Sequence, residues 1–158
     1  MDKTELIKFT NKYLDTEQRY ICVSRPRRFG KSMTLNMLAA YYSRGCNSIE
    51  LFKGRKIEND KSFHECLNKY DVIYLNMQHF LIESKNKSII AYLERVLIEE
   101  MREEYNGLFS DQEDTLAAIF RKIYIKSNIK FIFLIDEWDC IMRERQESEE
   151  LQKEYLNF

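Results

Sequence analysis

The sequence of 158 residues is long enough to form one domain around a single core. It carries 25 basic and 26 acidic side chains, a balance that argues against a protein that coats a polyanion. The hydrophobic content of 44% excludes a disordered chain, and no apolar run reaches the roughly 18 residues of a membrane-spanning helix. Because the first residues contain no apolar signal segment, we expect a cytoplasmic protein without a membrane partner.

Hydrophobic spacing predicts that helices and strands alternate along the chain, which is the pattern of an α/β fold. The predicted helices lie at residues 4–14, where Thr4 is the cap, and at 31–44, 62–70, 87–105 and from Asp111 to a turn at 127–128. Short helical turns are expected at 46–60, and the charged stretch from Arg143 predicts a last helix with a solvated face.

Three short apolar runs predict the strands of a parallel sheet. They are residues 20–24 (YICVS), which have the pattern of a strand buried on both faces, 71–77 (DVIYLNM) and 131–135 (FIFLI). Asn76, Gln78 and His79 lie at the end of the second run, the edge where ligands bind in open α/β sheets, and one of them could contact a phosphate or its water. Trp138, which follows the third run, is expected to be a packing anchor.

Gly30, Lys31 and Ser32 stand between a predicted strand and a predicted helix, where a phosphate-binding loop must lie. The free amides and the dipole of a helix N-terminus favour an anion at this place. Gly30 would let the backbone approach a phosphate closely, because glycine has no Cβ. Lys31 would reach the β- and γ-phosphates, and the hydroxyl of Ser32 would complete a Mg²⁺ shell.

The loop departs from the phosphate-loop consensus G-x-x-x-x-G-K-[ST] at its first position, where Arg25 stands in place of glycine. A loop with less glycine is expected to offer fewer backbone donors. Arg25, Arg27 and Arg28 could compensate by placing positive charge directly on the phosphates. The alternative interpretation is that these three arginines form a solvated basic turn.

The third predicted strand ends in Asp136 and Glu137, the pair that a P-loop ATPase needs beside its loop. Asp136 would hold Mg²⁺ through water, and Glu137 would orient and polarise the attacking water as a general base. The alternative is an acidic helix start, since Asp and Glu favour helix N-termini. Together with Lys31 and Ser32, the pair favours the ATPase branch of the P-loop proteins over the kinase branch.

The four cysteines are expected to be reduced, buried thiols rather than disulfides or zinc ligands. They lie far apart in the sequence and form no CxxC pair, although metal sites need clustered ligands. Their positions are Cys22, Cys46, Cys66 and Cys140.

The motifs as a group resemble those of the AAA-ATPase-like family of bacterial and archaeal proteins, which carry an RPRRFGKS-type loop and an LIDE[YW]D strand end. The matching segments run along essentially the whole chain and are DKTELI (2–7), RPRRFGKS (25–32), AAYYSRGC (39–46), YLNMQ (74–78) and LIDEWDC (134–140). The resemblance implies a nucleotide loop made of Arg25, Pro26, Arg27, Arg28, Phe29, Gly30, Lys31 and Ser32. It also implies that Ser32 and Asp136 bind Mg²⁺, and that Glu137 and Lys31 are catalytic.

The resemblance implies a P-loop NTPase fold, a three-layer α/β sandwich with a parallel sheet, in which residues 1–158 are the N-terminal part of a single ATPase domain. ATPases of this type order their strands 5-1-4-3-2, and we expect the chain to be truncated before strand 4. Strand 1 (residues 20–24) and strand 3 (residues 131–135) would then either pair directly or leave an open groove between them. The exposed strand edges of such a groove would favour self-association. Many family members end in a domain similar to PD-(D/E)XK nucleases, and the given sequence does not contain it. A whole protein with such a domain could contact nucleic acid through it.

We therefore expect a domain that binds ATP with Mg²⁺ and hydrolyses ATP in the full-length protein, but weakly or not at all in this fragment. One alternative is a nucleic-acid-binding module that uses the basic RPRR loop and Lys31 on phosphate backbones. The near-zero net charge and the lack of a stacking platform beside the loop count against it. The other alternative is an inactive structural remnant.

Overall fold

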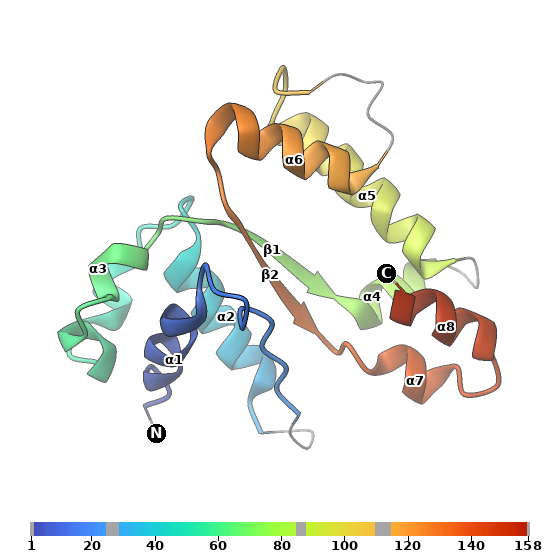
Figure 1. Ribbon diagram of the computed structural model, residues 1–158. Coiled ribbons are helices and arrows are strands. Elements are labelled where there is room, and N and C mark those ends of the chain that lie inside the picture. The colour runs from blue at the N-terminus through green and yellow to red at the C-terminus, as the bar shows by residue number, and fades with distance from the viewer. Residues whose placement is uncertain (1, 25–28, 85–87, 110–114, 158) are drawn as a thin grey trace. The chain divides into compact units, whose positions relative to one another are not determined.

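The computed structural model describes residues 2–24, 29–84, 88–109 and 115–157 (Figure 1). The chain divides into two compact units. The first unit comprises Met1–Tyr74 and Phe131–Leu134, and the second comprises Leu75–Lys130 and Ile135–Phe158.

The first unit contains α-helices and short 3₁₀ helices. They are α1 (Glu5–Tyr13), α2 (Lys31–Tyr42), the 3₁₀ helices η1 (Ile49–Phe52) and η2 (Lys56–Asn59), and α3 (Phe63–Cys66). All of them fall where the hydrophobic spacing predicts helices or helical turns. The capping role of Thr4 differs from the prediction, because its hydroxyl accepts a hydrogen bond from the amide of Ile57 (3.3 Å) instead of capping α1.

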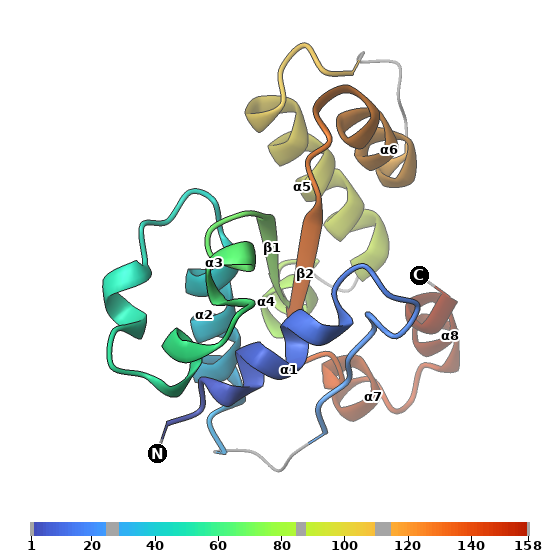
Figure 2. The same cartoon turned by 60° about the vertical axis from the view of Figure 1, so that its left-hand side comes forward.

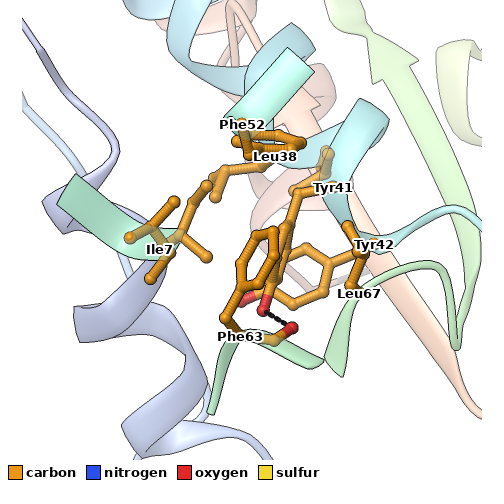
Figure 3. Close-up of a cluster of buried hydrophobic side chains, with 9 residues drawn as sticks. Ile7, Leu38, Tyr41, Tyr42, Phe52, Phe63 and Leu67 are labelled. Carbon is orange, nitrogen blue, oxygen red and sulfur yellow. Dashed lines mark hydrogen bonds between the residues drawn. The ribbon is translucent and has the colours of Figure 1, made fainter. Parts of the chain in front are cut away.

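An aromatic cluster, built from side chains of α2 and of the elements packed against it, forms the core of the first unit (Figure 3). The rings of Tyr41 and Tyr42 meet edge to face at 4.8 Å, and Tyr41 also lies 5.5 Å from the ring of Phe52. The hydroxyl of Tyr41 donates to the carbonyl of Phe63 at 2.8 Å, so that this buried polar atom is satisfied. The other buried members of the cluster are Ile7, Leu38, Ile57, Leu67 and Leu134.

The side chain of Asn11 on α1 forms hydrogen bonds with the polar atoms of this core. Its amide nitrogen donates to the hydroxyls of Tyr41 and Ser62, each at 2.9 Å, and its amide oxygen accepts from the hydroxyl of Tyr42 at 2.7 Å. Burial raises the pKa of both tyrosines, so their hydroxyls remain donors over the whole physiological range. These bonds fix α1 against α2.

The predicted buried strand at residues 20–24 is wrong. The segment belongs to no helix or strand, and its side chains are exposed, with 82% for Tyr20 and 44% for Val23. The apolar, β-branched composition of YICVS describes a strand that packs on a pleated surface, and β-propensity has little force without such a neighbour. In the described ranges, no partner strand lies along this segment.

The strands β1 (Asp71–Asn76) and β2 (Phe131–Asp136) pair as a parallel two-stranded sheet, and their arrowheads lie at the same end in Figure 1. This confirms two of the three predicted strands and the α/β character of the chain. One face of the sheet is buried through Ile73, Leu75 and Leu134, while Phe133 and Ile135 of the other face are close to half exposed.

The second unit consists of helices. They are α4 (Met77–Glu83), α5 (Ile89–Glu104), α6 (Leu116–Ser127), α7 (Cys140–Glu144) and α8 (Glu149–Asn157). Helix α4 packs against α5 and α7, and α5 packs against α6, beside which it lies in both Figure 1 and Figure 2. The predicted apolar stripes of α5 and α6 are confirmed by the burial of Leu93, Leu97, Ile119 and Ile123.

Helix α4 was not predicted from the sequence, and the start of α6 differs from the prediction. Asp111, the expected first residue of α6, lies outside the described residues. Thr115 is the cap instead, because its hydroxyl accepts a hydrogen bond from the amide of Ala118 at 3.3 Å.

The cysteines differ in burial. Cys140 is fully buried and Cys66 half-buried, whereas Cys22 and Cys46 lie in exposed loop segments, so the prediction that all four are buried is wrong for these two. Burial raises the pKa of the Cys140 thiol to about 11. In the part of the chain that the structure describes, no helix is both long enough and apolar enough to cross a membrane.

Candidate functional site

Gly30 is the last residue before α2 and adopts a left-handed backbone conformation, with φ 74° and ψ 34°. A residue with a Cβ would be strained in this conformation, so the turn into the helix requires glycine. The hydroxyl and the amide of Thr34 both donate to the carbonyl of Gly30, at 2.9 and 3.1 Å, and fix the first turn of α2. Since glycine has no side chain that could cap the helix, the amides of this turn are suited to bind an anion.

Lys31 is the first residue of α2 and is half-buried, and Ser32 and Phe29 are exposed. These three residues and Gly30 belong to the first unit. The rest of the predicted nucleotide loop, Arg25, Pro26, Arg27 and Arg28, lies outside the described residues, so the roles of those four side chains stay predictions.

Lys3 contacts the loop and was missed by the reasoning from sequence. Its Nζ donates to the carbonyl of Phe29 at 3.1 Å, and a Cβ placed on Gly30 would lie only 2.7 Å from the same nitrogen. A side chain at residue 30 would therefore also displace the Lys3 ammonium from its present position. The signal in the sequence was the DKT segment at the start of the chain, which belongs to the matching motifs but had no role assigned.

Asp136 is the last residue of β2, Glu137 directly follows it, and both belong to the second unit. The Asp136 side chain is buried, and its Oδ1 accepts the amide of Glu137 at 3.0 Å. Glu137 has φ 52°, a left-handed conformation that is uncommon for a residue with a Cβ. Backbone strain of this kind is concentrated at functional positions, where the surrounding structure maintains it.

Arg143 holds the carboxylate of Glu137. Its guanidinium donates to Glu137 Oε2 and to Asp139 Oδ1, each at 3.1 Å, and to Gln78 Oε1 at 3.2 Å. Burial disfavours the charge of Arg143, but the hydrogen bond with Glu137 and the negative charges of Asp139 and Glu137 outweigh this effect and raise the pKa of Arg143. The expectation that Arg143 belongs to a solvated helix face is wrong, since its side chain is only 28% exposed.

The spacing of four residues between Asp139 and Arg143 could have indicated an ion pair on a helix. The further hydrogen bonds of Arg143 to Glu137 and Gln78 depend on the tertiary arrangement, so they could not be inferred from spacing.

The polar residues that follow β1 make contacts within the protein. Asn76 caps α4, because its Oδ1 accepts the amides of Gln78 and His79 at 3.1 and 3.3 Å. Gln78 also donates to Glu144 at 2.9 Å, and His79 is exposed. A phosphate contact of one of these side chains stays a prediction. Trp138 is 41% exposed, so it is only partly packed against the protein, and its role as a packing anchor stays a prediction.

The donor set suits Mg²⁺ bound together with phosphates. In residues 2–24, 29–84, 88–109 and 115–157, no group of three or more His, Cys, Asp or Glu side chains could hold a metal ion by itself. Mg²⁺ in nucleotide sites takes only one or two protein oxygens and completes its shell with phosphates and water. The Ser32 hydroxyl and the Asp136 carboxylate are hard oxygen donors of the required kind.

The chain was compared with known proteins. A family model described as "AAA-ATPase_like: Predicted AAA-ATPase" matches residues 1–158 and confirms the resemblance indicated by the motifs. No curated protein and no solved structure matched the sequence.

Proposed function

Because the chain belongs to the AAA-ATPase-like family, we propose that it is part of a P-loop ATPase domain that binds ATP with Mg²⁺ at the start of α2. The observation that carries this proposal is Gly30, whose left-handed conformation directly precedes Lys31 and Ser32 at a helix N-terminus. We further propose that residues 1–158 belong to a three-layer P-loop sandwich. The parallel pair of β1 and β2, with helices connecting the two strands, supports this fold.

In this proposal the residues from Arg25 to Ser32 enclose the phosphates of ATP. The amides at the start of α2 donate to phosphate oxygens, and Lys31 places its ammonium group on the β- and γ-phosphates. Arg25, Arg27 and Arg28 add positive charge where other phosphate loops rely on glycine amides.

Hydrolysis is proposed for the whole protein and uses the acidic end of β2. Glu137 orients a water molecule for in-line attack on the γ-phosphate and accepts its proton, and Arg143 holds the Glu137 carboxylate in place. Lys31 stabilises the charge that develops on the transferred phosphoryl group. Ser32 and Asp136 would hold Mg²⁺, which, when bound, neutralises charge on the β- and γ-phosphates.

Nucleotide affinity tests the proposal directly. Lys31→Ala should weaken MgATP binding at least tenfold, because it removes the ammonium group of the first residue of α2, which is proposed to bind the phosphates. Titration calorimetry measures this, with Lys53→Ala as the control, since Lys53 is an exposed lysine whose ion pair with Glu50 is within one turn. Glu137→Gln in the full-length protein should keep the affinity and lose turnover.

Equal affinity of wild type and Lys31→Ala would contradict nucleotide binding at this loop. A single-stranded RNA or DNA probe separates the remaining alternatives. If the chain bound the probe, and MgATP neither displaced it nor raised the unfolding temperature, the nucleic-acid-binding module would replace the ATPase. If no ligand bound at all, the chain would be a structural remnant.

A further inference from the structure

The side chain of Lys3 forms a hydrogen bond with the Phe29–Gly30 peptide of the proposed nucleotide loop. The Nζ atom of Lys3 donates to the carbonyl of Phe29 at 3.1 Å, across 26 positions of sequence. The same nitrogen would meet a Cβ on Gly30 at 2.7 Å, closer than real side-chain contacts allow. Lys3 therefore occupies its present position beside the Phe29–Gly30 peptide in space that a Cβ on residue 30 would take.

The backbone on both sides of Lys3 is anchored to η2. Asp2 accepts the amide of Thr4 at 2.8 Å with one carboxylate oxygen and the amide of Lys56 at 3.0 Å with the other. The hydroxyl of Thr4 accepts the amide of Ile57 at 3.3 Å. The backbone beside Lys3 is therefore held by hydrogen bonds at two points, although the lysine side chain itself is exposed.

The helix that follows Lys3 is also fixed relative to α2. Asn11 of α1 bonds both Tyr41 and Tyr42 at the far end of α2, with distances of 2.9 and 2.7 Å. Ile7 of the same helix is fully buried in the aromatic cluster. Because α1 is packed on α2 in this way, the position of Lys3 relative to the start of α2 is determined by the core.

The bond from Lys3 decides which way the Phe29–Gly30 peptide faces. A trans peptide directs its carbonyl and its N–H to opposite sides, and no described peptide bond of the chain is cis. With the carbonyl directed to Lys3, the N–H of Gly30 is directed away from it. A carbonyl oxygen turned toward an anion would repel it, whereas an N–H turned toward it would bind it.

We propose that Lys3 is a positioning residue of the nucleotide loop, which holds the carbonyl of Phe29 so that the Gly30 amide is presented to phosphate. This inference rests on the proposed function. Lys3 acts through the loop backbone, and in this role its ammonium group bonds the protein rather than ATP. The segment DKT at positions 2–4 is then part of the nucleotide site, although 26 residues separate Lys3 from Phe29.

The test compares Lys3→Met with the wild-type chain. Methionine keeps an unbranched apolar stem and removes both the charge and the donor. Two measurements are needed, namely amide hydrogen exchange at residues 30–34 without nucleotide, and MgATP affinity by calorimetry. We expect exchange at these amides to become several-fold faster and MgATP affinity to fall about fivefold, since an exposed charged hydrogen bond contributes modestly.

Two further variants and one further measurement make the result specific. Lys53→Met carries the same change at another exposed lysine and should change neither measurement. Lys3→Arg retains charge and donors and should restore more than half of the lost affinity. The unfolding midpoint of Lys3→Met in urea should equal that of the wild type, because a general loss of stability would also accelerate exchange.

The outcomes separate this inference from the proposed function. If the wild type binds MgATP and Lys3→Met matches it in affinity and in exchange, Lys3 has no positioning role. If only the unfolding midpoint falls, Lys3 is merely structural and the inference is overturned. If the wild type binds no MgATP, the proposed function fails, and exchange alone then decides whether Lys3 orders the loop or the inference is overturned as well.

Discussion

At the scale of single residues, Gly30 and Gly54 have almost the same positive φ but different surroundings. Gly30 has φ 74° and lies against Lys3, whereas Gly54 has φ 71° and has no atom within 4 Å of the position of a Cβ. Alanine variants of the two glycines can therefore separate two effects. Both would show the loss of stability from the left-handed conformation, and only the variant at Gly30 would also displace Lys3.

Replacing each glycine by alanine should therefore give different results. Both Gly30→Ala and Gly54→Ala should lose about 1 kcal/mol of unfolding free energy through backbone strain. Gly30→Ala should in addition weaken MgATP binding severalfold, because the new methyl group displaces the Lys3 ammonium. Urea unfolding and calorimetry measure the two effects, and equal MgATP affinity of the two variants would contradict a role of this contact.

At the scale of elements, α7 is joined to the start of α4 by the side chain of Arg143. The guanidinium bonds Gln78 of α4 and also Glu137 and Asp139, which precede α7. The side chains of Arg143 and Glu137 are 28% and 29% exposed, so water screens this network less than an ion pair on an open helix surface.

Arg143→Met should lower the unfolding free energy by about 1–2 kcal/mol, because it leaves the carboxylates of Glu137 and Asp139 together without their cation. Arg95→Met is the control, since Arg95 pairs with Glu99 one turn away on α5 and both side chains are more than half exposed. The control should lose less than about 0.5 kcal/mol. Chemical denaturation measures both, and equal losses would mean that the Arg143 network adds nothing beyond a surface pair.

The elements also show what could be predicted from sequence. Helices with an apolar stripe, such as Ile89–Glu104, and the runs DVIYLN and FIFLID were predictable because their own periodicity or composition determines them. Residues 20–24 were not, because an apolar run forms a strand only beside a partner. Helix α4 was missed because Met77–Glu83 is short and follows a strand without a break, and the Asn76 cap was interpreted as a ligand-binding side chain.

In the candidate site too, some residues were predictable from sequence and some contacts were not. The residues Gly30, Lys31 and Ser32 were predictable because the local motif itself specifies a turn into a helix. The contacts of Lys3 with Phe29 and of Arg143 with Glu137 depend on tertiary packing, and the first of these joins residues far apart in sequence. Local patterns contain no information on which distant side chain will approach a given carbonyl or carboxylate.

At the scale of the whole molecule, two aspartates make the first unit sensitive to acid. Hydrogen bonds from the amides of Thr4 and Lys56 lower the pKa of Asp2 from 3.8 to about 2. Hydrogen bonds from the hydroxyl and the amide of Ser62, together with Lys8, lower the pKa of Asp60 from 3.8 to about 2. A depressed folded-state pKa stabilises the fold above the unfolded value of 3.8, and this contribution is lost as the pH falls toward 2.

We therefore expect the first unit to lose stability between about pH 4 and pH 2. The double variant Asp2→Asn, Asp60→Asn should show a shallower dependence over this interval, because the two titrating groups are gone. Thermal unfolding followed by the near-ultraviolet circular dichroism of the buried tyrosines measures the effect. An identical dependence in wild type and double variant would show that other groups govern the acid response.

The exposed ring of Trp138 has a practical consequence. The chain contains one tryptophan, so all indole fluorescence comes from the residue directly after Glu137. Because the ring is 41% exposed, its emission wavelength and its quenching by iodide report the polarity and solvent access of this one place. The wild-type chain thus contains an optical reporter beside the proposed general base, and stopped-flow mixing with MgATP can follow it without any label.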